Sequence, residues 1–354
     1  MNRSFPVTIF GYKNYLSLRF QRGSKLPMLG KNKKSPYYGF PMIGKSSIEA
    51  ALALREGLEK VTDAYRLVHR DECGAFSVDR YGDWLLVTGY DESLPSKKLL
   101  KKIGAGLREI PCKGGIVRTN LRDPHKRKLF SDLEVFGEPA PEMFFVTEHG
   151  LKYEVSLNEA QHPGLFLDQR DSRRHVAEAA KGKRMANLFS FTCSFSMAAA
   201  AAGAEVVFSV DLAAGCLERG KRNFEMNGLA DSGRGKFVKE DARKWLARQV
   251  RRKEANLENF PAWDIIICDP PVFAAAPKKG EAFSVEKEWP FLAESIRSIL
   301  SDDGVALFAN NHRGGDDGFY FSTLQQQFSN VTMLEAPVDF PNIGNPHVRT
   351  YWCT

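Results

Sequence analysis

The sequence lacks the features that mark membrane, secreted and zinc-binding proteins. No apolar run approaches the ~20 residues that a membrane-spanning helix needs. The six cysteines form no CxxC pair and lie tens of residues apart, so neither a zinc site nor a disulfide framework is favoured in a chain of 354 residues. These absences predict a globular protein in a reducing compartment, with no metal ion and no membrane partner.

Acidic residues are absent from the first 48 positions, which carry nine lysines and arginines. A basic, acid-free and serine-bearing N-terminus is typical of an organellar transit peptide. A disordered basic arm that touches RNA fits the same composition. Residues 1–47 are therefore predicted to be one or the other. The protein is predicted to be intracellular, in a mitochondrion or plastid if the source is eukaryotic and in the cytoplasm otherwise.

Residues 48–160 show helix and strand patterns that predict a small α+β domain. The expected elements are a helix over 46–61, a hairpin at Tyr81-Gly82-Asp83, a basic helix over 94–110, a strand over 114–123 and a hairpin at His149-Gly150.

Residues 161–354 alternate apolar strands with helices, which predicts an α/β domain with a parallel, doubly wound sheet. Strands are expected over 184–191, 205–211, 236–241, 264–269 and 304–311, and helices over 168–182, 195–202, 213–227, 242–254 and 284–300. Two last strands, over 331–340 and 348–353, follow with little helix and are expected to form an antiparallel hairpin at the sheet edge.

The loop after the first parallel strand lacks the GxGxxG pattern that lets a backbone approach a pyrophosphate, which argues against NAD or FAD. S-adenosylmethionine has no phosphates and tolerates a bulkier loop. Asp211, 21 residues beyond Ser190, stands where such folds hold ribose hydroxyls. A helix N-cap explains Asp211 and Asp241 equally well. The backbone amide of Ala242 could meet an adenine edge.

Asp269 ends a buried strand and is followed by Pro270 and Pro271. Two prolines fix the backbone and remove two amide donors, which would form a stiff lip beside a reacting group. Phe273 could stack on an extruded base. The alternative is a strand-terminating turn with a core phenylalanine.

Several ordered motifs together resemble a bacterial family of S-adenosylmethionine-dependent rRNA methyltransferases. They are FSVDRYGDWLLV, GLFLDQRDSRR, NLFSFTCSFSMAAAAAGAEVV, SVDL and CDPPVF, and NNHRG with HVRTYWC is most similar to the C-terminal guanine methyltransferase module of a bifunctional branch. The resemblance covers residues 70–353 and implies a Rossmann-like class I methyltransferase sheet. It also implies S-adenosyl-L-methionine as cofactor.

The resemblance implies roles for individual residues. The cofactor would be held by Phe166, Asp168, Arg170, Asn187, Phe189, Ser190, Thr192, Asp211, Leu212, Asp241, Ala242 and Asp269, and the catalytic set would be Asp269, Pro270, Pro271, Phe273, Asn310 and Asn311. The family usually has glycine where this chain has Cys193, which could narrow the pocket. The family's N-terminal RNA-binding β-barrel is not visible in the sequence.

Relatives that methylate cytosine carbon place a cysteine nucleophile after the fifth strand, where this chain has Asn310 and Asn311. Cys268 should point into the core by strand alternation. Methylation of a base nitrogen is therefore predicted, and the resemblance to the guanine-modifying branch implies guanine as the base. Cys193 leaves open a non-catalytic RNA-binding or ribosome-assembly protein on a decayed methyltransferase fold. A nicotinamide oxidoreductase is opposed by the missing glycines.

Residues 95–128 carry eleven lysines and arginines against two acids, more excess charge than the net +7 of the whole chain. A clustered basic face is typical of nucleic-acid binding, and a solvated helix face is the alternative. rRNA or another structured RNA is the predicted partner. The candidate contacts are Lys97, Lys98, Lys101, Lys102, Arg118, Arg122, Lys126, Arg127 and Lys128.

Overall fold

The computed structural model describes most of the chain from residue 50 onward. The described ranges are 50–70, 76–90, 96–108, 110–119, 133–159, 162–256, 258–274, 282–312, 317–341 and 348–354, without the side chains of Lys102 and Asp317. Residues 39–354 form one compact unit. The predicted N-terminal arm or transit peptide falls outside the described ranges, and the predicted boundary at residue 160 stays a prediction.

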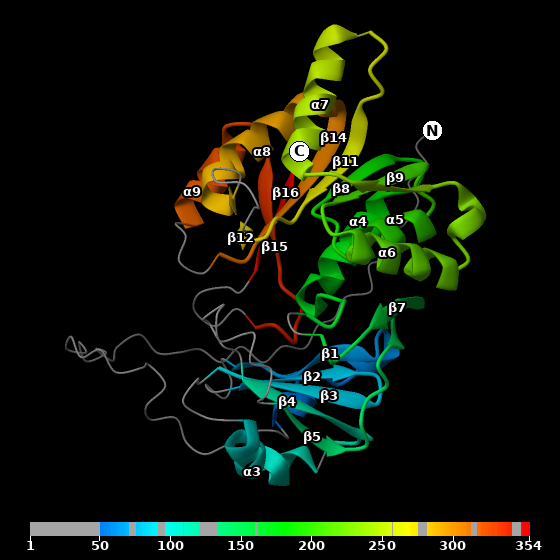
Figure 1. The fold of residues 1–354 in the computed structure, drawn as a ribbon. Coiled ribbons are helices and arrows are strands. Elements are labelled where there is room, and N and C mark those ends of the chain that lie inside the picture. Colours follow the sequence, from blue (N-terminus) through cyan, green and yellow to red (C-terminus); the bar gives the residue numbers. More distant parts are fainter. Residues whose placement is uncertain are drawn as a thin grey trace, which may run out of the picture. The chain divides into compact units, whose positions relative to one another are not determined.

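The small α+β region contains a five-stranded sheet in the order β1-β2-β3-β4-β5 (Figure 1). Its strands are β1 (Ala64–Val68), β2 (Phe76–Tyr81), β3 (Trp84–Gly89), β4 (Gly114–Thr119) and β5 (Leu133–Gly137), and its helix is α3 (Ser96–Leu107). Every pair is antiparallel except β3 with β4, because α3 crosses over between those two strands. The second hairpin, β6 (Phe144–Glu148) and β7 (Leu151–Val155), turns at His149-Gly150 as predicted.

Strands β1 and β5 were not predicted from the sequence, and the helix predicted before β1 is longer than the one in the structure. Among the described residues of the expected helix over 46–61, only 50–53 are α-helical, and a turn leads to the 3-10 helix η1 (Leu58–Lys60). Gly57 breaks the helix with a φ of 92°, a left-handed conformation that glycine adopts without strain.

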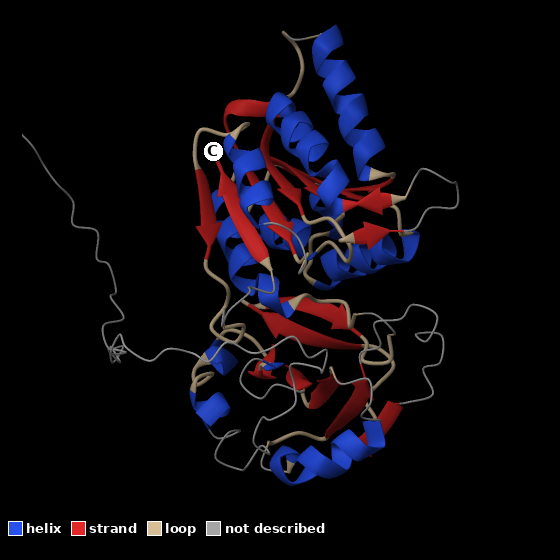
Figure 2. Cartoon of the chain, turned by 90° about the vertical axis from the view of Figure 1, so that its left-hand side faces the viewer, coloured by secondary structure: helices blue, strands red, loops and turns tan. Residues whose placement is uncertain are grey.

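The second region is built on a seven-stranded sheet in the order β10-β9-β8-β11-β14-β16-β15 (Figures 1 and 2). Its strands are β8 (Arg184–Leu188), β9 (Val206–Asp211), β10 (Gly235–Lys239), β11 (Trp263–Cys268), β14 (Leu300–Asn310), β15 (Val331–Leu334) and β16 (Arg349–Cys353). The helices are η3 (Leu167–Gln169), α4 (Arg170–Ala179), α5 (Ser194–Ala201), α6 (Ala214–Met226), η4 (Ala230–Ser232), α7 (Ala242–Ala255), α8 (Val285–Ile299) and α9 (Asp317–Gln325). A two-stranded ribbon, β12 (Phe273–Ala274) and β13 (Phe283–Ser284), precedes α8.

The first five strands of this sheet are parallel and β16 is antiparallel to both of its neighbours. The predicted antiparallel hairpin is confirmed as a pairing of β15 with β16. β16 lies inside the sheet and β15 forms the edge, and the nine-residue α9 precedes β15 where little helix was expected.

The sheet is covered on both faces, and strand alternation assigns the side chains to two cores. Ile265 and Ile267 of β11 pack with α4, α5 and α6, whereas Ile266 and Cys268 pack with α7, α8 and α9. Cys268 is fully buried, which confirms the predicted core position. No helix among the described residues combines the length and apolar composition that a membrane crossing requires.

Candidate functional site

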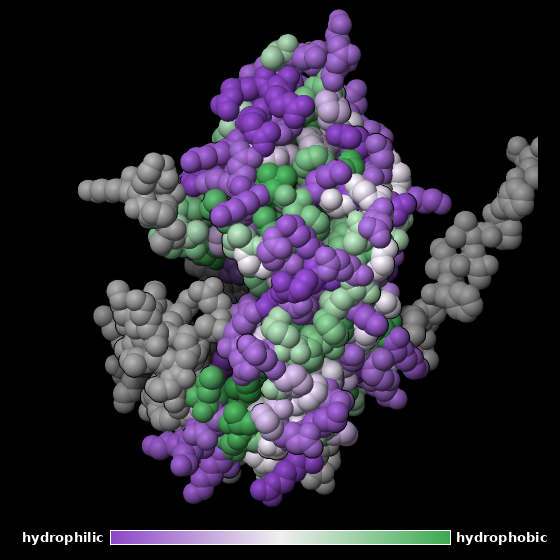
Figure 3. All heavy atoms as spheres, turned by 45° about the vertical axis from the view of Figure 1, so that its right-hand side comes forward, coloured by the Kyte–Doolittle hydropathy of each residue, from purple (hydrophilic) through white to green (hydrophobic). Residues whose placement is uncertain are grey.

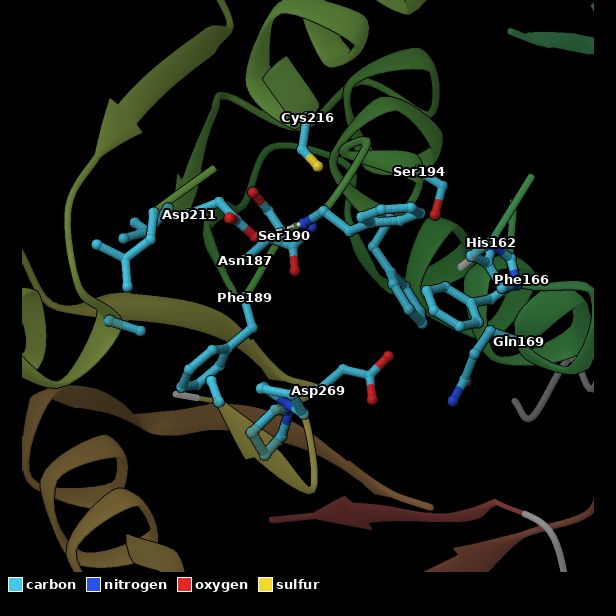
Figure 4. A pocket seen from close by; sticks show the side chains of 18 of the residues that line it. His162, Phe166, Gln169, Asn187, Phe189, Ser190, Ser194, Asp211, Cys216 and Asp269 are labelled. Atoms are coloured by element: carbon cyan, nitrogen blue, oxygen red, sulfur yellow. Dashed lines mark hydrogen bonds between the residues drawn. The ribbon is translucent and has the colours of Figure 1, made fainter. Parts of the chain in front are cut away.

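The predicted residues at the carboxyl ends of the parallel strands converge on one cavity of about 940 Å³ (Figure 4). The predicted residues that line it are Phe166, Asp168, Asn187, Phe189, Ser190, Asp211, Leu212, Asp241, Ala242, Asp269, Pro270, Pro271 and Asn311. This is the position where open parallel sheets bind ligands.

The loop after β8 adopts a strained conformation that places its side chains around the cavity. Phe189, Phe191 and Cys193 all have positive φ angles, a region that residues other than glycine rarely occupy. The loop is fixed by hydrogen bonds, from the Ser190 amide to the Val210 carbonyl oxygen (3.1 Å) and from the Cys193 amide to the Ser190 carbonyl oxygen (2.7 Å).

Asp211 joins this loop to the second strand. Its carboxylate accepts the Phe191 amide at 2.9 Å and the Ala213 amide at 2.8 Å, so it fixes both loops at the edge of the cavity. Burial raises the pKa of this carboxyl, and the backbone hydrogen bonds only partly oppose that effect. A carboxylate offers about four lone-pair positions, so Asp211 can still accept two hydroxyl groups.

Beside Asp211, at the end of β10, the cavity combines an acid with apolar side chains. Asp241 caps α7 through the Arg243 amide (2.8 Å), and the Arg243 guanidinium binds the same carboxylate. Burial opposes the charge of Asp241, but these bonds lower its pKa overall. Asp241 therefore caps the helix and also lines the cavity, and its predicted role toward the cofactor stays a prediction. Phe189 and Phe283 lie 5.3 Å apart between ring centroids and give this end flat apolar walls.

Asp269 and Asp168 form the most distinctive electrostatic feature of the cavity. Figure 4 shows the Asp269 carboxylate pointing into the space, and within the described residues neither carboxylate has a salt-bridge partner. Burial raises the pKa of Asp269 to about 7, and the nearby charge of Asp168 adds to the increase. Burial also raises the pKa of Asp168. Two desolvated carboxylates at one end of a cavity favour a cationic group of a ligand.

Four predicted residues lie outside the cavity lining, each for a visible reason. The Arg170 guanidinium is buried against the Asp339 carboxylate (2.6 Å), and the Thr192 hydroxyl donates to the Gly164 carbonyl oxygen (2.6 Å). Asn310 is buried and its side-chain oxygen accepts the His312 amide (2.8 Å). Phe273 sits on β12 with 65% of its surface exposed, so it is no core phenylalanine.

The sequence reading missed several residues that line the cavity. They include Glu159, His162, Gln169, Arg173, Phe191, Ser194, Phe195, Cys216, Arg243, Lys244, Phe283 and Val348. His162 stacks on Phe166 with ring centroids 3.7 Å apart, and burial lowers its pKa to about 3, so the ring is neutral. In the sequence, His162 and Pro163 directly precede the motif that begins at Gly164, and this adjacency could have identified His162 as a site residue.

Cys193 does not narrow the cavity, contrary to the sequence expectation. Its thiol is fully buried and does not line the cavity. A Cβ placed on Gly220 of α6 would collide with the Cys193 sulfur, so the sulfur occupies space that only a glycine at position 220 leaves free. The family's glycine is therefore replaced here by a side chain that points into the helix layer.

Only some of the predicted RNA-binding residues lie in the part of the chain that the structure describes. Lys97, Lys98 and Lys101 are exposed on α3, and Lys102 belongs to the same helix. Arg118 is half-buried and donates to the Glu159 carbonyl oxygen at 3.0 Å, so it does not belong to an exposed basic face. Arg122, Lys126, Arg127 and Lys128 lie outside the described residues.

Known proteins are similar to this chain over most of its length. A sequence profile described as S-adenosylmethionine-dependent methyltransferase matches residues 70–348. Ribosomal RNA large subunit methyltransferase K of Neisseria meningitidis is 32% identical over 298 residues, covering 82% of this chain and 79% of that protein. Ribosomal RNA large subunit methyltransferase K/L of Shewanella sp. (strain MR-4) is 30% identical over 85% of this chain, but the chain spans only 41% of that relative.

Solved structures of other proteins have a similar fold. A protein crystallised in complex with S-adenosylhomocysteine (SAH) is 29% identical and superposes with a TM-score of 0.75, covering 87% of this chain and 80% of the other. The S-adenosylmethionine-dependent methyltransferase of Agrobacterium tumefaciens, at 18% identity and a TM-score of 0.61, shares the fold.

Proposed function

We propose that this chain, which belongs to the family of S-adenosylmethionine-dependent methyltransferases, methylates a base nitrogen of large-subunit rRNA, with guanine as the base. The family confirms the cofactor expected from the sequence. The rRNA substrate rests on the names of the relatives from Neisseria and Shewanella. The observation that carries the chemistry is the pair Asp168 and Asp269 without salt-bridge partners among the described residues.

The described residues fit the cofactor. Asp211 would hold the ribose hydroxyls, and the apolar end near Phe189 and Asp241 would hold the adenine. Asp168 and Asp269 would face the sulfonium, whose positive charge relieves the cost of burying two carboxylates. When bound, the cofactor supplies an electrophilic methyl group at that sulfonium.

Asp269, Pro270 and Pro271 form the wall beside which a base would be positioned. A guanine ring nitrogen is already nucleophilic, so positioning at near-attack distance is the main requirement. As positive charge moves to the base, the carboxylates of Asp269 and Asp168 stabilise it without reorganisation. Phe273 is exposed next to this wall and remains available to stack on an extruded base.

A covalent route through cysteine has no support in the described cavity. Cys268 is buried in the core beneath α7, α8 and α9, and burial raises the pKa of its thiol. Cys216 lines the cavity, but Figure 4 places it beside Asp211 and across the cavity from Asp269. Burial also raises the pKa of Cys216 to about 11, so the thiol stays protonated.

The alternative of a decayed, non-catalytic protein depended on Cys193, which points away from the cavity. An rRNA substrate implies an intracellular location. The transit-peptide option for residues 1–47 stays a prediction.

The test is methylation of large-subunit rRNA, free and in ribosomal particles, followed by mass spectrometry of the nucleosides. We expect a methylated guanine with the wild-type protein and with Cys268→Ala, and strongly reduced product with Asp269→Asn. A carbon-methylated pyrimidine, or no methylation of either substrate, would contradict the proposal.

A further inference from the structure

The small sheet carries an unusual set of polar side chains on the face opposite α3. Strand alternation puts Leu85, Val87 and Val117 against α3, where they form an apolar core. The alternate positions on the other face hold charged and hydroxyl groups. They are Arg66 on β1, Asp79 and Tyr81 on β2, Thr88 on β3 and Arg118 on β4.

The strand register brings these side chains into pairs. Arg66 is directly opposite Asp79, and its guanidinium binds both carboxylate oxygens, at 2.6 and 3.0 Å. Thr88 is directly opposite Arg118 on the parallel neighbour. The Arg66 guanidinium also lies 4.4 Å from the ring centroid of Phe340, which holds it in place.

These residues surround a second cavity, of about 300 Å³. Its lining includes His162, Phe166, Asp168, Asn311 and Val348, which also line the cofactor cavity. The two spaces therefore adjoin, and Asp168 stands between them. A volume of this size lies at the lower end of the ~300–1,000 Å³ that is usual for small-ligand sites.

The charges in this second cavity are incompletely matched by the protein. Arg118 has no carboxylate partner among the described residues, and its burial lowers the pKa of the guanidinium. A half-buried cation with one carbonyl contact is stabilised when an anion meets it. Each oxygen of Asp79 also keeps a lone-pair position beyond its bond to Arg66.

We infer that the second cavity receives the extruded guanine nucleotide, and that Arg66, Asp79 and Arg118 of the small sheet recognise it. This inference takes its substrate class from the proposed function. Arg118 meets the phosphate of the nucleotide. The Arg66–Asp79 pair presents a donor and an acceptor side by side to the base edge. The small region thus positions and selects the target base, beyond attracting RNA by charge.

Guanine matches this pair better than adenine. Guanine presents the O6 acceptor next to the N1–H and N2–H donors, which correspond to the guanidinium of Arg66 and the carboxylate of Asp79. Adenine presents an unprotonated N1 in the same place, so the Asp79 carboxylate would face a lone pair without a hydrogen. A site built for such donors rejects a base that lacks them, because its own buried polar groups then stay unpaired.

The experiment measures binding of guanosine 5′-monophosphate and adenosine 5′-monophosphate to the full chain saturated with SAH, by saturation-transfer NMR. We expect the guanine nucleotide to bind more tightly. Arg118→Gln should weaken it about tenfold, the loss of one charged hydrogen bond. Thr88→Leu should fill the cavity and abolish binding, whereas the matched variant Thr88→Val keeps the side-chain volume and most of the affinity.

Controls separate this inference from folding and from the proposed function. The SAH affinity of each variant should stay near that of the wild type, because Thr88 and Arg118 do not line the cofactor cavity. The melting temperature of each variant checks that it is folded under the conditions of the binding measurement. Equal binding of both nucleotides, unchanged binding in Arg118→Gln and Thr88→Leu, or no nucleotide binding would each overturn the inference. Methylation of rRNA by the wild type is measured separately. A protein that does not methylate rRNA can still bind the guanine nucleotide in the second cavity, and a protein that methylates rRNA can lack this nucleotide site, so the two proposals are tested independently.

Discussion

Asp269 shows how a single residue couples the fold to the chemistry. It directly follows β11, a strand buried on both faces, so its carboxylate is held where water solvates it poorly. The two prolines that follow prevent the backbone from relaxing away from this position. The raised pKa is therefore a consequence of sequence order, a buried strand followed by an acid and two prolines.

The pH dependence of cofactor binding tests this electrostatic role. Because the pKa of Asp269 is about 7 in the free protein, its carboxyl gains charge as the pH rises from 6 to 8. The sulfonium cofactor should therefore bind more tightly at higher pH, by up to about tenfold over this range. SAH lacks the sulfonium charge and serves as the matched ligand in calorimetric titrations. The ratio of the two affinities should be independent of pH in Asp269→Asn.

Asp168 supplies a second variant for the same titration. Its charge helps to raise the pKa of Asp269, so Asp168→Asn should move the midpoint of the pH dependence to lower pH. The titration is followed as above, with the ratio of S-adenosylmethionine affinity to SAH affinity at each pH. An unchanged midpoint in this variant would show that the two carboxylates do not interact.

Asp211 gives an independent prediction for the ribose end. Asp211→Ala should weaken cofactor binding by roughly the 1.5–3 kcal/mol of a hydrogen bond to a charged group. Because Asp211 also holds the Phe191 and Ala213 amides, Asp211→Asn is the milder comparison, which keeps one acceptor oxygen. Calorimetry measures both variants, and full affinity in Asp211→Ala would remove this residue from the ribose role.

At the scale of elements, the sequence predicts the helices and strands that have a regular apolar pattern. It does not predict the strands that depend on contacts with residues distant in sequence. The parallel strands and their helices follow from apolar runs and helical spacing, and the expected ranges fall within a few residues of β8 to β11 and α4 to α8. β1 and β5 were missed because each has only five residues and carries a charged residue, Arg66 in β1 and Glu134 in β5. Arg66 pairs with Asp79 across the sheet, a contact that local sequence does not show.

Some residues of the candidate site were likewise predictable from the sequence and others were not. Acids at strand ends were predictable, because all parallel strands of a sheet end at the same edge. Arg170 and Thr192 could not be excluded from the cavity, because their partners Asp339 and Gly164 are distant in sequence or in an irregular loop. His162 was missed because its position depends on stacking against Phe166.

The contact between the loop before α5 and helix α6 makes a testable packing prediction. Gly220→Ala should destabilise the protein by about 1–3 kcal/mol, because the new methyl group would meet the Cys193 sulfur. The same substitution in a Cys193→Gly background should cost much less, since the sulfur is then absent. Denaturant unfolding of the four proteins measures the coupling, and additive effects would show that the two positions do not compete for the same space.

At the scale of the whole molecule, cationic side chains lie on both regions. Figure 3 shows hydrophilic residues gathered over α7, where Arg251 and Arg252 are exposed, and α3 exposes Lys97, Lys98 and Lys101. Net positive charge alone therefore does not identify the RNA-binding surface. The inferred nucleotide cavity lies on the face of the small sheet opposite α3, so RNA that enters the cavity reaches α3 only by extending around the edge of that sheet.

Neutralising α3 should distinguish this surface from the cations of α7. The triple variant Lys97→Gln, Lys98→Gln and Lys101→Gln should weaken binding to structured RNA of any sequence. It should also reduce the slope of log affinity against log salt by about 0.7–0.9 for each phosphate that the protein no longer neutralises.

The control removes charge from α7 with Arg251→Gln and Arg252→Gln, and there the slope should change less. Cofactor affinity should be unchanged in both variants, because none of these side chains lines the cofactor cavity. If the α7 variant flattens the salt dependence more than the α3 variant does, the RNA approaches over α7, and the basic helix predicted from the sequence is a solvated face.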